Sequence, residues 1–559
     1  MPAISRRAVA LGIVAGWPAA ACLAAAAAEH KPEAPPAAPA EKPRPRITIS
    51  KETTYLTGPL RPDGYVDYVA ALNAELSRGV TPENNAAVPL MLAFGPKAVS
   101  EKQREAFFKL LGVPVPPDGG NYFVAVYRYV NYLHGLDELP GIEKRPSTPI
   151  GSKEWDEADA ECAQAQKRPW SREEFPVIAG WLEANHEPLR LIGEAARRPR
   201  FYAPLVPSGD PPMTSVLLSI SDAFFNAARL LEVRAMLHLH DGKVDRAWQD
   251  LLACQRLARH VGQGPFLTDG LIAIAVEQTA LRGDAALAHY GRPTAAKIRQ
   301  MRADLGALPA APKMADRIDH SERFFGLDLI TTAARKGVSH LRDIMGTFSD
   351  EPQGLIEKIR SAGLDAAADW DEPLRISNRW YDRWAAAARK PARAERVATM
   401  ADCKKDIKAL AAGVQRVPGR LLEKMPRPAA AQWIGEAFAV FLTEALDGVT
   451  RAEDRLAAER TLADVALDLA VYRADHGKYP DRLADLKPKY RAEIKDPFLD
   501  ADLIYRPAAD GFLLYSVGPN GKDDGGRNRL DYLTDESPPP GYEQWDDVVL
   551  RMPVSPRKR

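Results

Sequence analysis

The last hundred residues constrain the fold more than any other part of the chain, because a helical pattern there gives way to strands. Apolar residues recur with helical spacing over 451–476, and a Gly-Lys-Tyr-Pro sequence then marks the end of that helix. Two short apolar runs, 503–506 and 512–517, are separated by Ala-Asp-Gly and predict a hairpin. A third strand is expected at 548–552, so the pattern predicts a helix packed on a small antiparallel sheet.

The motifs of this region occur in a defined order. After the helix come YPDRLADL, then DPF, then a strand with a Tyr, and finally LYSVGPNGKDDGG. In this order they resemble the globular head of the major pseudopilin of type II secretion systems. The predicted fold is therefore mainly α: an irregular α-helical array over residues 47–445, followed by a small pseudopilin-like α+β domain over 450–559.

The same resemblance implies a calcium site in the loop that follows the second strand. The residues it implies lie in that loop and in an acidic pair before the last strand: Val517, Asn520, Lys522, Asp523, Asp524, Asp546 and Asp547. Val517 and Lys522 would supply backbone carbonyls. Asn520 stands where the family has Asp, and Asp523 and Asp524 restore the negative charge that this change removes.

The residue types of the loop suit calcium, but they also suit a plain turn. Calcium takes roughly six to eight hard oxygen ligands, which clustered Asp and Asn side chains and carbonyls can supply. Asn, Gly and Asp also favour turns when no metal is present. The segment 527–545 separates the loop from the acidic pair. The sequence leaves both interpretations open.

Most of the remaining chain, from about residue 63 to 445, has helical periodicity. One helical pair is recognisable, because Phe224, Leu231 and their neighbours at helical spacing form an apolar face that ends at Asp-Gly-Lys, residues 241–243. Trp248 and Leu251 belong to the return face. Small residues on both sides of the Gly resemble one tetratricopeptide repeat, without a second copy in register. We expect an antiparallel helical hairpin within the array.

Two segments, PWSREEFPVIAGWLEANHEPL and RAWQDLLACQRLARHVGQG, also resemble parts of large exported helical proteins of planctomycete-type bacteria. This resemblance implies that a helical part is joined to a C-terminal domain. It implies no particular chemistry.

The N-terminus has the pattern of an export signal. Two arginines precede an apolar, Ala-rich run, so residues 1–28 are predicted to be a signal peptide cleaved near Ala28. A lipid anchor at Cys22 and an uncleaved membrane anchor are the alternatives. The Pro/Ala-rich segment 29–46 predicts an extended linker. We expect a periplasmic or secreted protein without a transmembrane segment after cleavage.

Charge and motif content restrict the function. Lys and Arg together number 75, as do Asp and Glu, so no basic field predicts a nucleic-acid partner. Cys162, Cys254 and Cys403 form no CxxC pair and predict neither a disulfide framework nor a zinc site. The histidines do not occur in a metalloprotease or nucleophile-elbow motif. No catalytic residue can be assigned.

These observations predict an exported, non-catalytic structural or binding protein that has a protein partner in the cell envelope. The alternative is an exported hydrolase with an active-site cleft in the helical part. A role as a filament subunit is not expected, because the helix before the C-terminal sheet is charged rather than an apolar stem.

Overall fold

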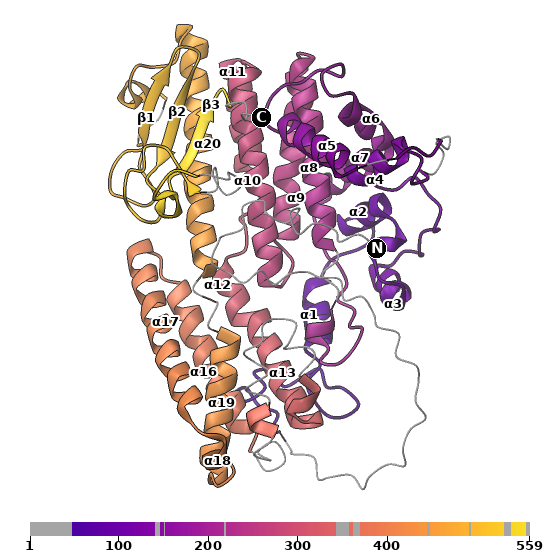
Figure 1. The fold of residues 1–559 in the computed structure, drawn as a ribbon, viewed down its shortest axis with the longest axis vertical. Coiled ribbons are helices and arrows are strands. Elements are labelled where there is room, and N and C mark those ends of the chain that lie inside the picture. Colours follow the sequence, from indigo (N-terminus) through magenta and orange to yellow (C-terminus); the bar gives the residue numbers. More distant parts are fainter. Residues whose placement is uncertain are drawn as a thin grey trace.

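A computed structural model shows a mainly helical fold with one small three-stranded antiparallel sheet near the C-terminal end (Figure 1). The predicted fold class is confirmed at this level. The predicted signal peptide with Cys22 and the predicted linker at 29–46 lie outside the described residues. The structure describes residues 47–139, 146–149, 151–216, 220–341, 357–360, 369–443, 446, 448–490, 493–529 and 538–554.

The N-terminal helices lie along one side of the molecule, coloured indigo to purple in Figure 1. Helix α2 is apolar on almost every residue, and it is buried against α7. Their bounds are α1 Tyr68–Leu76, α2 Ala87–Phe94, α3 Glu101–Leu111, α4 Val126–Leu133, α5 Ser152–Ala165, α6 Pro176–Ala184 and α7 His186–Arg197.

A bundle of long helices forms the centre of the molecule. It consists of α8 Ile220–His240, α9 Val244–Val261, α10 Leu267–Tyr290 and α11 Ala295–Gly306. Helices α8 and α9 are the predicted hairpin, since α8 ends at His240 and Gly242 turns the chain with a φ of +72°. The apolar residues assigned to its two faces, Phe224 and Trp248 among them, are buried. Whether the hairpin belongs to a tetratricopeptide series stays a prediction.

A second group of helices occupies the other end of the molecule, pink to orange in Figure 1. Helix α12 passes through a π-helical turn, Ile318–Glu322, directly into α13. Its neighbours α16 and α19 lie side by side, and α17 packs on both. The bounds are α12 Met314–Arg317, α13 Arg323–Lys336, α16 Asp371–Ala388, α17 Arg393–Arg416, α18 Gly419–Leu422 and α19 Arg427–Thr443.

The C-terminal part consists of α20 Val449–His476 and strands β1 Ile504–Ala508, β2 Gly511–Ser516 and β3 Val548–Met552. The strands form an antiparallel meander in the order β1-β2-β3. The register pairs Ala508 with Gly511 across the predicted hairpin turn and Phe512 with Met552 on the other side. Helix α20 ends at Gly477, whose φ of +78° provides the expected left-handed cap. These four elements follow the sequence prediction closely.

Helix α20 packs against α10 of the bundle and also against β2 and β3. One apolar core therefore runs from the N-terminal helices through the bundle into the sheet, and it includes Leu231, Val276, Val465 and Leu514. Within the described residues, no helix is both long and apolar enough to cross a membrane.

Candidate functional site

The loop after β2 is held at its base by Asp496, which belongs to the Asp-Pro-Phe turn before the sheet. Its Oδ1 accepts hydrogen bonds from Ser516 Oγ at 2.7 Å and from the Phe498 N–H at 2.8 Å. Its Oδ2 accepts one from the Val517 N–H at 3.0 Å. Asp496 is buried, so these bonds compensate the loss of water around its carboxylate. The carboxylate thereby fixes the direction in which the loop leaves the strand.

The structure brings Asp546 back to this loop although a long segment separates the two. The Asn520 N–H donates to Asp546 Oδ2 at 3.1 Å, and the Asp546 N–H donates to Asp524 Oδ2 at 3.1 Å. Asn520 Nδ2 also donates to Asp524 Oδ2, at 3.2 Å. At Gly518 a Cβ atom would lie 2.2 Å from the Asp546 carbonyl oxygen, so only glycine permits this approach. Asn520, Asp524 and Asp546 are therefore one cluster.

Asp547 points into the fold rather than toward this cluster. It is fully buried, and its Oδ2 accepts hydrogen bonds from the N–H groups of Gly526 at 2.8 Å and Arg527 at 3.3 Å. Its Oδ1 accepts one from the Asp524 N–H at 3.4 Å. Burial raises the pKa of Asp547 to about 6, against the lowering effect of these bonds. This geometry makes Asp547 a residue that shapes the loop.

The other residues implied for calcium are arranged around the loop. Asp523 Oδ1 accepts hydrogen bonds from the Tyr515 hydroxyl at 2.9 Å and from the Gly525 N–H at 2.8 Å, which directs that oxygen toward the sheet. The Lys522 N–H donates to Asn520 Oδ1 at 2.7 Å. Val517 is anchored through its N–H to Asp496, which leaves its carbonyl as the group that the resemblance assigns to metal.

One atom of the cluster has no partner within the described residues. Asp546 Oδ1 is buried and makes no hydrogen bond. Burial, reinforced by the neighbouring charge of Asp524, raises the pKa of Asp546. A cation beside Asp546 and Asp524 would satisfy this oxygen and relieve the repulsion. The described residues contain no group of three or more His, Cys, Asp or Glu side chains arranged for a metal, so backbone carbonyls would have to complete the coordination shell.

Sequence reasoning missed two features of this site. The role of Asp496 was not recognised, although the Asp-Pro-Phe motif was the available signal. The Arg527 guanidinium lies 3.9 Å from the centroid of the Trp545 ring, and the Arg529 N–H donates to the Trp545 carbonyl at 2.8 Å. These contacts join the two ends of the long segment, and single-sequence periodicity carries no signal for them.

A second polar cluster lies in the helical part, where α13 meets the loop before α8. Arg335 donates two hydrogen bonds to Asp210, at 2.6 and 2.7 Å, and one to Asp63 at 2.9 Å. Burial opposes the ionisation of Asp210, but hydrogen bonds from Lys336 and Arg335 outweigh it and lower the pKa. Burial raises the pKa of the neighbouring Asp328 to about 7. The pKa values of these two nearby carboxyl groups are thus shifted in opposite directions.

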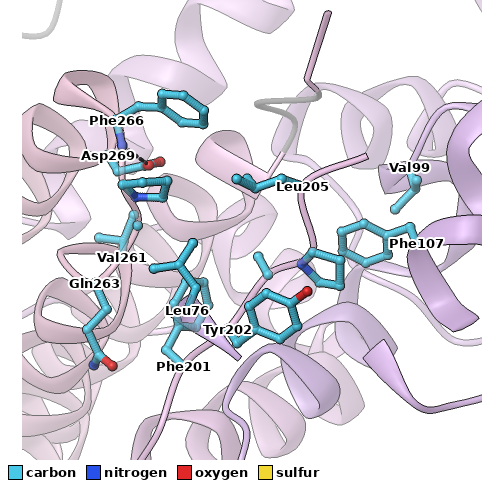
Figure 2. A pocket seen from close by; sticks show the side chains of 14 residues that line it. Leu76, Val99, Phe107, Phe201, Tyr202, Leu205, Val261, Gln263, Phe266 and Asp269 are labelled. Atoms are coloured by element: carbon cyan, nitrogen blue, oxygen red, sulfur yellow. Dashed lines mark hydrogen bonds between the residues drawn. The ribbon is translucent and has the colours of Figure 1, made fainter. Parts of the chain in front are cut away.

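A cavity opens between the N-terminal helices and the link from α9 to α10 (Figure 2). Its walls are mainly apolar, with Phe107, Phe201 and Phe266 among them, and its volume is about 40 Å³. Asp269 accepts a hydrogen bond from the Phe266 N–H at 2.9 Å, and burial raises its pKa to about 6. Ligand pockets are typically about 300–1,000 Å³. This cavity is too small for the substrates of most hydrolases.

Comparison of the chain with protein-family models, with curated proteins and with solved structures finds no match.

Proposed function

We propose that the protein is an exported, non-catalytic structural or binding protein of the periplasm or cell envelope. Its helical part presents surfaces to a protein partner, and its C-terminal pseudopilin-like domain binds calcium through the loop at 517–526. The observation that carries the calcium proposal is Oδ1 of Asp546 beside Asp524, which is buried and has no hydrogen-bond partner among the described residues.

Several contacts support a functional rather than incidental cluster. The approach of Asp546 to the loop requires glycine at 518, and Asn520 bridges both carboxylates through its N–H and its amide. Like charges held this close cost stability unless a proton or a cation neutralises them. Calcium would take oxygen ligands from Asp524, Asp546 and the carbonyls of Val517 and Lys522, in a shell that tolerates irregular geometry.

Titration calorimetry and thermal unfolding test this proposal on the full chain. Calcium at a hundredfold excess over its Kd should stabilise the folded state by about 2.7 kcal/mol and raise the melting temperature. In chelator, Asp546→Asn should melt at or above the wild-type temperature, because the variant removes a buried charge. In millimolar calcium the order should reverse, because the variant has lost a ligand.

The matched control is Asp481→Asn, which changes an exposed carboxylate of the same part of the chain that forms an ion pair with Lys478. It should keep the wild-type response to calcium. Identical melting temperatures of the wild type in calcium and in chelator, with no heat of binding, would contradict the proposal. The cluster would then be a hydrogen-bonded turn that binds no calcium.

An exported hydrolase with its site in the helical part is the second candidate function, and the cluster around Asp210 favours it. Two carboxyl groups whose pKa values are moved in opposite directions are the arrangement that acid–base hydrolysis uses. Turnover of chromogenic ester, phosphate or glycoside substrates, lost in Asp328→Asn, would support this candidate. Absent turnover, or turnover unchanged in that variant, would exclude this cluster as the site.

A further inference from the structure

One pole of the molecule carries a local excess of positive charge. It is formed by the end of α17, by α18 and by the start of α19 (bottom of Figure 1). Among residues 404–427, seven Lys and Arg residues stand against two carboxylates, Asp406 and Glu423. The whole chain has no net charge. The excess is therefore a property of this pole and not of the protein.

The cations at the tip have exposed side chains. Arg416, Arg420, Lys424 and Arg427 are exposed, and within the described part of the chain none of them forms an ion pair. Two arginines farther from the tip are neutralised, since Arg383 pairs with Asp406 and Arg396 pairs with Asp454. The positive charge at the tip is thus available to a partner.

One apolar side chain, that of Leu421, is exposed between Arg420 and Lys424 in the sequence. Leu421 on α18 is 55% exposed, whereas the next residue, Leu422, is fully buried in the core shared by α13, α16 and α19. Because Leu422 anchors the one-turn helix, Leu421 is held on the outside. An exposed leucine close in the chain to exposed Arg and Lys residues is the composition of surfaces that enter the interface of an anionic membrane.

The N-terminal end of the described chain joins the fold near the same pole. The Thr48 N–H donates to Asp371 Oδ1 at 2.9 Å, at the start of α16. Gly435, about two turns into α19, lies against Pro373, so the start of α16 is roughly 12 Å from the pole along the helix axis. The segment before residue 47, which the sequence predicts to be an export signal or lipid anchor with a linker, therefore enters at this end.

We propose that this pole docks the protein onto the anionic lipid surface of an envelope membrane. Arg416, Arg420, Lys424 and Arg427 contact lipid phosphates, and Leu421 enters the boundary between headgroups and acyl chains. A bilayer fits better than an acidic protein, because an exposed leucine on α18 stands beside exposed cations and can enter the apolar side of the headgroup region. The proposal concerns a surface far from the calcium cluster and does not depend on it.

Vesicle co-sedimentation of the full chain tests the proposal, with vesicles of phosphatidylcholine alone or containing phosphatidylglycerol. Each cation near an anionic surface strengthens binding by about fivefold. The variant Arg416→Gln/Arg420→Gln/Lys424→Gln/Arg427→Gln should therefore bind phosphatidylglycerol vesicles at least about a hundredfold more weakly. Leu421→Asn should weaken binding several-fold, and high salt should release the wild type.

The matched control changes four exposed cations elsewhere, Arg78, Lys97, Lys102 and Lys109, to Gln. It alters the net charge equally and should leave vesicle binding unchanged. All variants share one N-terminus, so any lipid anchor contributes equally to each. Equal weakening by both sets would overturn the proposal, as would equal binding to neutral vesicles. Binding of the wild type to polyglutamate but not to vesicles would identify the pole as a dock for acidic protein instead.

Discussion

Two buried carboxylates of helix α10, Glu277 and Asp284, differ in how many hydrogen bonds they accept. Toward α20, Glu277 receives hydrogen bonds from both Arg259 and Arg460, which lower its pKa although burial opposes ionisation. Two turns later, toward α9, Asp284 accepts a single hydrogen bond, from Gln255 Nε2 at 2.8 Å. Its other oxygen has no partner in the described chain, and burial raises its pKa to about 7.

The contrast shows where the fold satisfies its buried charges. At the contact between the bundle and the C-terminal part, Asp468 of α20 also accepts from Arg302, and Arg473 donates to the His289 carbonyl at 2.8 Å. The bundle interior instead contains Asp284, whose pKa burial raises to about 7. The contact with α20 therefore pairs its buried carboxylate more completely than the bundle interior does.

The largest expected effect comes from separating the two parts. The sequence predicts a unit over 450–559, but α20 is buried both against α10 and against the sheet. We expect a fragment of residues 449–559 to aggregate, because separation exposes the flank of α20 that packs on α10. A dispersed amide spectrum and a cooperative unfolding transition of the fragment would contradict this prediction. They would show that α20 and the sheet fold without the contact with α10.

Glu277→Gln should produce the next largest effect. It keeps the side-chain shape but leaves Arg259 and Arg460 without their carboxylate, and breaking a buried pair costs about 3–5 kcal/mol. Because Arg460 is partly exposed, we expect the lower end of that range. Denaturant unfolding measures the change, with Gln278→Glu on the same helix as a control that should lie within about 1 kcal/mol of the wild type.

Asp284→Asn should have a smaller effect that depends on pH. The folded-state pKa of Asp284 is raised, so its ionisation removes stability as pH rises from about 4, where the unfolded chain ionises, to about 7. The free energy of unfolding of the wild type should decline over this window. The variant should reduce the decline by about 1.4 kcal/mol for each unit of pKa shift, and should be more stable than the wild type at pH 8.

Buried Glu232, whose pKa burial also raises to about 7, accepts a hydrogen bond from Gln166 and should add to the same slope. Glu232→Gln therefore gives an independent variant of the same prediction. A pH profile of unfolding that is flat between 4 and 8 in the wild type would show that both carboxyl groups are ionised in the fold.

The sequence was informative wherever local chemistry decides the structure. Gly242 and Gly477 end helices, and Ala509-Asp510 turns the hairpin, because a left-handed cap or a tight turn needs only a few neighbouring residues. The resemblance also anticipated that Asp546 returns to the loop. It assigned Asp547 to metal on the same grounds, whereas the structure surrounds Asp547 with backbone N–H groups, and its ligation stays a prediction.

Features that depend on distant packing had no such signal. Asp284 and Glu277 are both acidic residues in a helix that is buried on most sides, and their sequence neighbours do not indicate that one contacts two arginines and the other a single amide. The contacts of Asp496 with Ser516 and Val517 arise only when the sheet forms, so the Asp-Pro-Phe motif alone does not predict them. Burial and partner choice at these positions are properties of the assembled fold.

The meander leaves β1 as an outer strand of the sheet, and that position has a consequence for self-association. An outer strand offers unpaired backbone groups on which a second copy could add a strand. A strand added to β1 would have to pair with Arg506 and Pro507, and Pro507 has no N–H to donate to the backbone hydrogen bonds. Addition of a strand from a second copy at the β1 edge is thereby discouraged by one residue, whereas β3, the other outer strand, contains no proline.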